Sequence, residues 1–477
     1  MSGNSVCPLD FRYGSEEMKR LFTEEARLGT LLKVEAALAL AEAEAGLIPR
    51  EDAERIASTV FRNEVSLERV RELEKETRHD VMAVTLALAE RCGPSGRFVH
   101  YGATSYDIVD TALALQLGEA LDIIRSDLIS LRDALLEQAV RHKGTVMLGR
   151  THGQSALPTT FGLKLAVFVS EFGRHIERLD QARPRICTGK MSGAVGTGAG
   201  FGSRALEIQR NVMRRLGLGI PEATNQILQR DRHAEFVLLL ASISTSVEKL
   251  ATELRLLQRS EVDEVREPFE EASQVGSSTM AQKRNPIVSE NACGLARVVR
   301  SLVIPALESN VLWHERDLTN SSAERILIPH AAILTDHILR NMTSVVRGME
   351  VRTEKMRANL EAAGREIMAE PVMLALIAKG MDRGEAHGLV RRISLRTSSG
   401  REDFGKAMMG EPEIRRLLTP EELERMLAPS AYIGAAVEIV EALAARVRGG
   451  TGAGSNPRSS TRTGGRQRGR KGTGRRT

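Results

Sequence analysis

Apolar residues recur at alternating intervals of four and three along three long stretches in the middle of the chain. One series lies within residues 104–141, a second runs from Phe161 to Leu179, and a third runs from Phe236 to Leu257. Since an α-helix turns once every 3.6 residues, this spacing places the apolar side chains along one side of each helix. The pattern predicts long helices that pack side by side at a small crossing angle, as in a helical bundle.

Further helical patterns flank these three series. A fourth long pattern covers residues 321–360, with a kink expected at Pro329, and shorter ones before the bundle cover residues 15–45, 51–61 and 66–91. Apolar seams that one chain leaves uncovered would be buried by association with further copies of the chain. We therefore predict an all-α fold with an N-terminal helical domain over residues 1–104, a central long-helix bundle over 105–355 and a C-terminal helical domain over 356–447.

Composition and charge agree with this picture and set the last thirty residues apart. Aromatic residues make up only 3% of the chain, which favours helices because strands recruit aromatic side chains. Residues 448–477 are rich in Gly, Ser, Thr and Arg, and they hold nine Arg or Lys and no acidic residue. Without these nine charges the formal net charge changes from +5 to −4. We predict a disordered, solubilising tail, although its charge alone would also let it contact nucleic acid.

Cysteine usage and hydropathy point to the cytoplasm. The four cysteines, Cys7, Cys92, Cys187 and Cys293, lie far apart and show no C-x-x-C spacing. This pattern predicts neither a disulfide framework nor a metal site. The chain has no secretory signal pattern and no apolar run near the roughly 18–20 residues of a transmembrane helix. We expect a soluble cytoplasmic protein.

Two polar segments interrupt the helical patterns in the first part of the chain. TRHDVMAV places His79 between Arg78 and Asp80 inside a helical pattern, and in VHYGATSYDIVD either Thr104 or Ser105 can cap the following helix. A helix N-terminus offers free N–H groups and a positive dipole end, which suit a phosphate or a carboxylate. Taken alone, a surface charge cluster and an ordinary helix cap explain these two segments equally well.

A third segment, GRTHGQSALPTTFG, places His152 in a short stretch bounded by glycine and proline. Imidazole is well matched to proton transfer near neutral pH, although a single loop histidine is more often inert. The glycines of 189–200 are scattered as in a dinucleotide-binding loop, but no strand pattern precedes them. We interpret residues 189–200 as a flexible turn or hairpin.

A fourth segment, GSSTMAQKRNP, combines hydroxyl groups with a cation. Asn285 and Pro286 predict the N-cap and first residue of a helix over 287–312, but a cap alone does not explain Ser277 and the nearby Lys283. The following segment, WHERDLTNSSAERI, holds two arginines, whose forked guanidinium groups suit carboxylates or phosphates.

Taken together, these segments resemble the fumarase/aspartase superfamily, whose signature is G-S-S-x-M-P-x-K-x-N. TRHDVMAV, GRTHGQSALPTTFGLK, NQILQRDRHAEF and WHERDLTNSSAER are similar, in the same order, to the adenylosuccinate lyase family. The likeness runs from about Arg12 to about residue 445. Ala281 stands where the signature has proline, which would make the loop less stiff.

The resemblance implies a β-elimination that releases fumarate from adenylosuccinate, giving AMP, and from the related ribotide SAICAR, giving AICAR. It implies no cofactor and no metal, a homotetramer built around the central bundle, and active sites to which three subunits contribute. It assigns the base to Ser277 and the general acid to His152. The substrate-binding positions that it implies are Arg12, Tyr13, Arg78, His79, Asp80, Thr104, Ser105, Gln226, Ser278, Lys283, Asn285, Arg316, Ser321, Ser322 and Arg325.

Five alternatives stay open at this point. Within the superfamily, 3-carboxymuconate cycloisomerase has a similar loop but a substrate without a nucleotide phosphate, and argininosuccinate lyase and fumarase fit the RHD and SSAER segments less well. A crystallin-like protein would keep the fold without the chemistry, which the presence of Ser277, His152 and Lys283 disfavours. Nucleic-acid binding rests on the tail alone.

Overall fold

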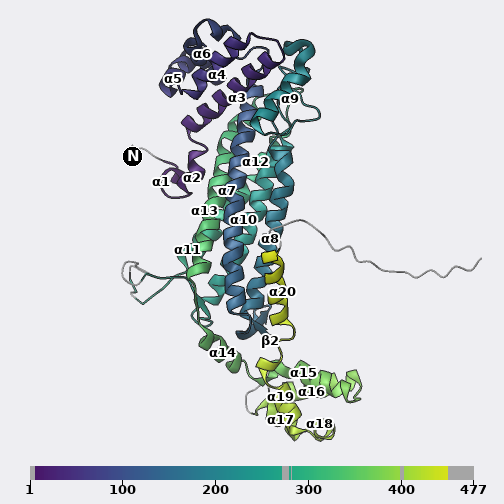
Figure 1. The fold of residues 1–477 in the computed structure, drawn as a ribbon. Coiled ribbons are helices and arrows are strands. Elements are labelled where there is room, and N and C mark those ends of the chain that lie inside the picture. Colours follow the sequence, from purple (N-terminus) through teal and green to yellow (C-terminus); the bar gives the residue numbers. More distant parts are fainter. Residues whose placement is uncertain (1–5, 271–278, 281, 398–401, 450–477) are drawn as a thin grey trace, which may run out of the picture.

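The protein is elongated, with a long bundle of helices between two smaller helical parts (Figure 1). The computed structural model describes residues 6–270, 279–280, 282–397 and 402–449. The predicted tail therefore lies almost wholly outside the described residues. Within them, none of the helices combines the length and the apolar character that crossing a bilayer requires.

Short helices at one end of the bundle form the N-terminal part. Side chains from α3, α4 and α6 pack with the first turns of α7 and with α9 in one apolar core. The elements of this part are α1 (Pro8–Phe11), α2 (Glu16–Arg20), α3 (Glu24–Glu44), α4 (Arg50–Phe61), α5 (Leu67–Thr77), α6 (Asp80–Cys92) and η1 (Gly93–Phe98), joined later in the chain by η2 (Ala199–Arg204) and α9 (Ala205–Leu216).

The predicted apolar seams form the core of the bundle, which confirms the central prediction. Leu117, Phe172 and Leu240 of three different helices are among its buried members. The bundle helices are α7 (Ser105–Arg141), α8 (Phe161–Ile186), α10 (Asp231–Leu257), α11 (Ile287–Ser301), α12 (Val303–Glu308) and α13 (Thr319–Gly348). Near the end of the chain, α20 (Ala436–Gly449) returns to the bundle and adds Val440 to the same core.

The C-terminal part has its own apolar core beyond the far end of the bundle. It consists of η3 (Arg365–Met368), α15 (Ala369–Ala378), α16 (Arg383–Thr397), α17 (Phe404–Gly410), α18 (Pro412–Leu417), α19 (Pro420–Met426) and η4 (Pro429–Ala431). The preceding helix α14 (Thr353–Ala362) adds Met356 to the bundle core. The three apolar cores agree with a three-part architecture, whereas the boundaries at residues 104 and 355 stay predictions.

Two small antiparallel sheets interrupt the helices. The first is a hairpin of β1 (Val146–Thr151) and β2 (Gln154–Thr160), in which Thr151 pairs with Gln154 across a two-residue turn. The second pairs β3 (Val265–Arg266) with β4 (Glu350–Val351). The helical pattern predicted over 321–360 is therefore interrupted once, because α13 ends at Gly348, β4 follows, and α14 begins at Thr353. Pro329 lies inside α13 without ending it.

Two predicted helices before the bundle are each divided in two. The helix expected over 15–45 is broken after α2, where Thr23 caps α3 by accepting the N–H of Ala26. The helix expected over 66–91 is broken at Arg78, whose φ of 52° is left-handed and ends α5. In both cases a side chain supplies the cap of a new helix, which the apolar periodicity did not reveal.

The helix predicted over 287–312 also differs in the structure. It ends at Ser301, because Pro305 has no N–H to donate to the carbonyl four residues earlier and its ring crowds that carbonyl. The N-cap is Pro286 rather than Asn285. The carboxylate of Glu267 accepts the N–H groups of Val288 and Ser289 in the first turn of α11, at 3.1 and 2.7 Å. A side chain distant in sequence therefore caps this helix in place of Asn285.

Candidate active site

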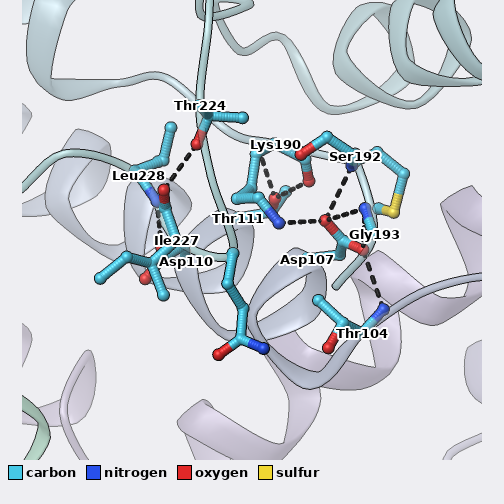
Figure 2. Close-up of polar contacts among 12 residues, drawn as sticks. Thr104, Asp107, Asp110, Thr111, Lys190, Ser192, Gly193, Thr224, Ile227 and Leu228 are labelled. Carbon is cyan, nitrogen blue, oxygen red and sulfur yellow. Dashed lines mark hydrogen bonds and ion pairs between the residues drawn. The ribbon is translucent and has the colours of Figure 1, made fainter. Parts of the chain in front are cut away.

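The N-terminus of α7 forms one end of the candidate site. Thr104 is its N-cap and Ser105 its first helical residue, which confirms the predicted helix start. The carboxylate of Asp107 turns back and accepts the backbone N–H of Thr104 at 2.9 Å (Figure 2). The first turn of the helix is thereby held in place by its own sequence, since a carboxylate at this position stabilises a helix start.

Asp107 also fastens the glycine-rich segment 189–200 against α7. It forms an ion pair with Lys190 and accepts the backbone N–H of Ser192 at 2.8 Å (Figure 2). One turn later, Thr111 exchanges hydrogen bonds with the backbone of Lys190 at 2.9 and 3.0 Å. The segment contains the predicted turn, at residues 194–195, but not the predicted hairpin. None of the described strands lies in it, and α7 supplies the polar partners that a second strand would have provided.

Breaking the buried Asp107–Lys190 pair should be costly. Neither side chain has any exposed surface. Replacing Lys190 by methionine leaves the carboxylate charge in the interior, which typically destabilises a protein by about 3–5 kcal/mol. Lys249 is a matched control because its ion pair with Glu171 is half exposed, so that Lys249→Met should cost less than about 1 kcal/mol. Urea unfolding at one protein concentration compares the variants, and equal losses would contradict the prediction.

A second buried cation, Arg230, joins three segments of the site. Its guanidinium donates to both oxygens of Asp110 on α7, at 2.7 and 3.1 Å, and its Nε lies 3.0 Å from Glu324 on α13. Asp110 also accepts the N–H of Leu228 at 2.8 Å (Figure 2). Arg230 therefore ties the segment before α10 to the first turns of α7 and α13. Sequence reasoning missed this role because the partners lie far apart in the chain.

Several predicted substrate-binding residues meet around these connections. The amide oxygen of Gln226 accepts a hydrogen bond from Arg316 at 3.0 Å. The guanidinium of Arg316 lies 3.6 Å from the centre of the Tyr106 ring, beside the start of α7. The serine pair 321–322 lies in the first turn of α13. Hydroxyl, amide and guanidinium donors from three elements thus converge at this end of the bundle.

Asp80 connects the N-terminal helices to α13. Its carboxylate accepts hydrogen bonds from Arg27 and Arg325, each at 2.9 Å. Burial alone would raise the pKa of Asp80, but the Arg27 guanidinium above all, together with Arg325, lowers it below its usual value. His79 is the N-cap of α6, where its Nδ1 accepts a backbone N–H at 3.2 Å. A neutral His79 ring then carries its proton on Nε2, on a half-exposed side chain.

Arg12 and Tyr13 lie beside a later part of α13. The Tyr13 ring packs 5.2 Å from the ring of His337, measured between centroids, and the N–H of Gly14 donates to His337 Nδ1 at 3.2 Å. The guanidinium of Arg12 lies 5.9 Å from the Tyr13 ring and is exposed. This predicted pair therefore lies against α13, the helix that carries Arg325.

His152 lies at the opposite end of the bundle, at the tip of the β1–β2 hairpin. It and Gly153 form the two-residue turn with φ values of 56° and 75°, the left-handed pair typical of a type I′ turn. Close to this turn, the guanidinium of Arg150 donates to both oxygens of the buried Glu264 at 3.0 and 2.8 Å. The exposed imidazole thus lies at the tip of a hairpin that an ion pair anchors, and the sequence pattern did not predict this hairpin.

Lys283 and Asn285 lie at the same end as His152, just before α11. The backbone carbonyl of Arg284, which lies between them, accepts a hydrogen bond at 3.1 Å from the side-chain amide of Gln258, the residue that follows α10. Ser277 and Ser278, the predicted base and its neighbour, lie outside the described residues, as does Ala281. Their predicted roles stay predictions.

One chain does not bring all these residues together. Thr104, Gln226 and Arg316 lie at the N-terminal end of α7, whereas His152 follows its C-terminal end. The 37 residues of α7 span about 55 Å at a rise of 1.5 Å per residue. Most of the predicted residues that the structure describes therefore form two groups near opposite ends of the bundle, whereas Arg12 and Tyr13 lie beside the middle of α13.

In the described part of the chain, no group of three or more His, Cys, Asp or Glu side chains is arranged to hold a metal ion.

Similarity to known proteins covers most of the chain. A family described as Lyase matches residues 10–301, and one described as Adenylosuccinate lyase C-terminus matches residues 366–443. An adenylosuccinate lyase of Pyrococcus abyssi is 52% identical over 92% of this chain and 97% of its own length. Among solved structures, a fumarate lyase from Mesorhizobium sp. BNC1 (32% identity) and the 3-carboxy-cis,cis-muconate lactonizing enzyme of Pseudomonas putida (33%) each superpose with a TM-score of 0.83. They cover 90% and 93% of this chain and 98% and 99% of their own.

Proposed function

This chain belongs to the adenylosuccinate lyase family, and on that premise we propose that it splits adenylosuccinate into AMP and fumarate, and SAICAR into AICAR and fumarate. Both reactions are β-eliminations that break a carbon–nitrogen bond, so the chain is a carbon–nitrogen lyase of purine nucleotide biosynthesis. The observation that carries this function is the match to adenylosuccinate lyases along nearly the whole chain. We propose that it acts in the cytoplasm.

The elimination needs a base, an acid and groups that stabilise charge. We assign proton abstraction to Ser277, whose hydroxyl must be activated by its surroundings, with Lys283 as the nearby cation in the sequence. Removing a proton beside a carboxylate builds negative charge, which cationic and N–H donors stabilise. We assign protonation of the departing nitrogen to His152, because an imidazole can donate a proton near neutral pH. No cofactor takes part in these steps.

The substrate carries a phosphate and two carboxylates, which match the cationic end of the bundle. Arg316 and Arg325 are the proposed anion-binding side chains there, with Arg12 beside the same helix α13. Arginine forks bind such groups through two parallel hydrogen bonds. The start of α7 adds the positive end of a helix dipole next to Arg316. The other residues of the predicted set, described above, complete the proposed substrate site.

We propose that each active site is shared between subunits of a homotetramer. Catalytic and binding groups separated by a helix of about 55 Å cannot reach one small substrate within a single chain. Antiparallel packing of α7 helices from different copies would bring one end of the bundle next to the other. Large apolar side chains that are exposed in one chain support such packing, including Ile304, Val311 and Trp313 at 60%, 78% and 76% exposure.

Fumarate release from purified protein tests the function. Adding adenylosuccinate should give AMP and fumarate in equal amounts, measured by absorbance and by chromatography of the products. Substrate-free protein and a sample supplied with 3-carboxymuconolactone are the controls. The likeness to the muconate enzyme makes this second compound the sharpest alternative. Turnover of the lactone, or no turnover of adenylosuccinate and SAICAR, would contradict the proposed function.

A further inference from the structure

The turn that carries Arg12 and Tyr13 is attached to one face of α13. The backbone N–H of Ser15 donates to Asp336 Oδ2 at 2.8 Å, and its hydroxyl donates to Oδ1 at 3.1 Å. The preceding N–H, that of Gly14, donates to His337, whose pKa burial lowers. A neutral ring can accept that hydrogen bond. Two successive backbone N–H groups of the turn therefore depend on two successive side chains of α13.

The turn also approaches α13 too closely for a side chain at Gly14. Its φ is +88°, and a Cβ at that position would lie 2.3 Å from Cγ2 of Ile333. Only glycine satisfies both the backbone angle and the close approach. Contact with Ile333, Asp336 and His337 thus leaves the turn little freedom to shift along the helix.

Asp336 shares its arginine partner, Arg340, with a second buried acid, Asp127. Arg340 lies 2.7 Å from Asp336 and 3.2 Å from Asp127 of α7, through the same Nε atom. Oδ1 of Asp127 and Oδ1 of Asp336 therefore share one guanidinium Nε, while Oδ2 of Asp127 has no hydrogen-bond partner among the described residues. Both carboxyl groups are buried beside this one guanidinium, and two like charges so close disfavour ionisation of both, which favours a proton on one of them.

We propose that Asp336 is a positioning residue of the substrate site, which holds the Arg12–Tyr13 turn in its binding position, and that the proton on Asp127 controls this hold. The inference rests on the proposed function, because it assumes that Arg12 and Tyr13 bind the substrate. Asp336 itself touches the turn and not the substrate.

The electrostatics give the direction of the pH dependence. Burial and then the neighbouring Asp336 carboxylate raise the pKa of Asp127 to about 8. Below that pH Asp127 is neutral and leaves Arg340 to Asp336; above it two carboxylates compete for Arg340. The other charged group at Arg340 is Glu17 of α2, at 2.9 Å, which adds a negative charge on the outer side. Raising the pH should therefore push Asp336 away from Ser15 and loosen the turn.

Folding stability should also depend on the protonation of Asp127. The pKa of Asp127 lies above its value in the unfolded chain, so the folded state binds the proton more tightly. The resulting contribution to stability is present at low pH and is lost as the pH rises towards about 8. Asparagine keeps a neutral donor in the same position, so Asp127→Asn should raise the melting temperature more at pH 8 than at pH 5.

Steady-state kinetics of three variants, with adenylosuccinate as substrate, test the proposal. Between about pH 7 and pH 9.5, KM of the unaltered enzyme should rise about tenfold, and Asp127→Asn should remove this rise. Asp336→Asn should raise KM about ten- to a hundredfold at pH 7, with kcat changed less than about threefold. Asp122→Asn is the matched control, since Asp122 lies on the same helix in an exposed ion pair and should follow the unaltered enzyme.

An activity-independent measurement accompanies the kinetics. The protection factors of the Gly14 and Ser15 amides, which correct for the intrinsic rise of exchange with pH, should fall in Asp336→Asn and, above about pH 8, in the unaltered enzyme. If Asp336→Asn does not fold, Ser15→Ala removes one of the two donors and should raise KM about three- to tenfold.

The results that would overturn the inference are distinct from failure of the proposed function. An equal pH-dependent rise of KM in Asp127→Asn and the unaltered enzyme would refute the role of the proton. A KM and exchange rate in Asp336→Asn no different from those of Asp122→Asn would refute the positioning role. By contrast, absence of turnover in the unaltered enzyme, or an unchanged KM in Arg12→Ala, would refute the assumed function or the binding role of the turn.

Discussion

Replacing His152 by asparagine is expected to lower kcat by about 10²–10⁴-fold while leaving the fold unchanged. The loss should be large because the departing purine nitrogen must gain a proton, and an amide cannot supply one. Stopped or continuous assays of fumarate release measure kcat, and circular dichroism and melting temperature report the fold. Substrate binding should change much less than turnover.

Asparagine is the informative substitution because of the backbone at this position. His152 has a φ of 56° and is followed by Gly153 in a two-residue hairpin turn. Asn-Gly is the sequence best suited to such a turn, whereas alanine would add strain there. His387→Ala, on the exposed side of α16 in the C-terminal part, serves as a control with expected normal turnover. A kcat within about tenfold of normal in His152→Asn would exclude the acid role.

The long helices could be predicted from the sequence, but their interruptions could not. Seams such as Leu117 to Leu135 bury one side of a helix over many turns. Burial of one side requires apolar residues at helical spacing, and this spacing can be recognised in the sequence. The breaks before Thr23 and at Arg78 depend on single capping side chains within otherwise continuous patterns. The turn of His152 and Gly153 is similarly local, and its strands carry no strong alternation of apolar and polar residues.

The polar connections of the site were hidden for a different reason. Asp107 could be recognised as a helix-start residue three positions after Thr104, but its ion pair with Lys190 joins residues far apart in the chain. Arg230 and Asp336 have the same property, since each acts through partners on other helices. Motif resemblance identified the residues expected to meet the substrate. It did not identify those that hold them, because that information lies in the packing.

Mixing two inactive variants should restore activity if each site is shared between subunits. His152→Asn alters one end of the bundle, and His79→Asn alters the other while keeping a side chain that can cap α6. In mixed oligomers, a site that takes residue 152 from one variant and residue 79 from the other is unaltered. Random assembly of equal amounts would form such sites about one quarter of the time, so activity should rise to about a quarter of normal.

The geometry of the chain makes this recovery a strict test. Residues 79 and 152 lie at opposite ends of a bundle whose central helix spans about 55 Å, so no single chain can supply both to one substrate. A mixture of His79→Asn with Arg325→Met is the control, because Asp80 joins these positions within one chain and should leave every site impaired. Co-purification of two differently tagged variants verifies that mixed oligomers form. If they form and activity stays at the level of the separate variants, the two ends do not meet across subunits in the way we propose.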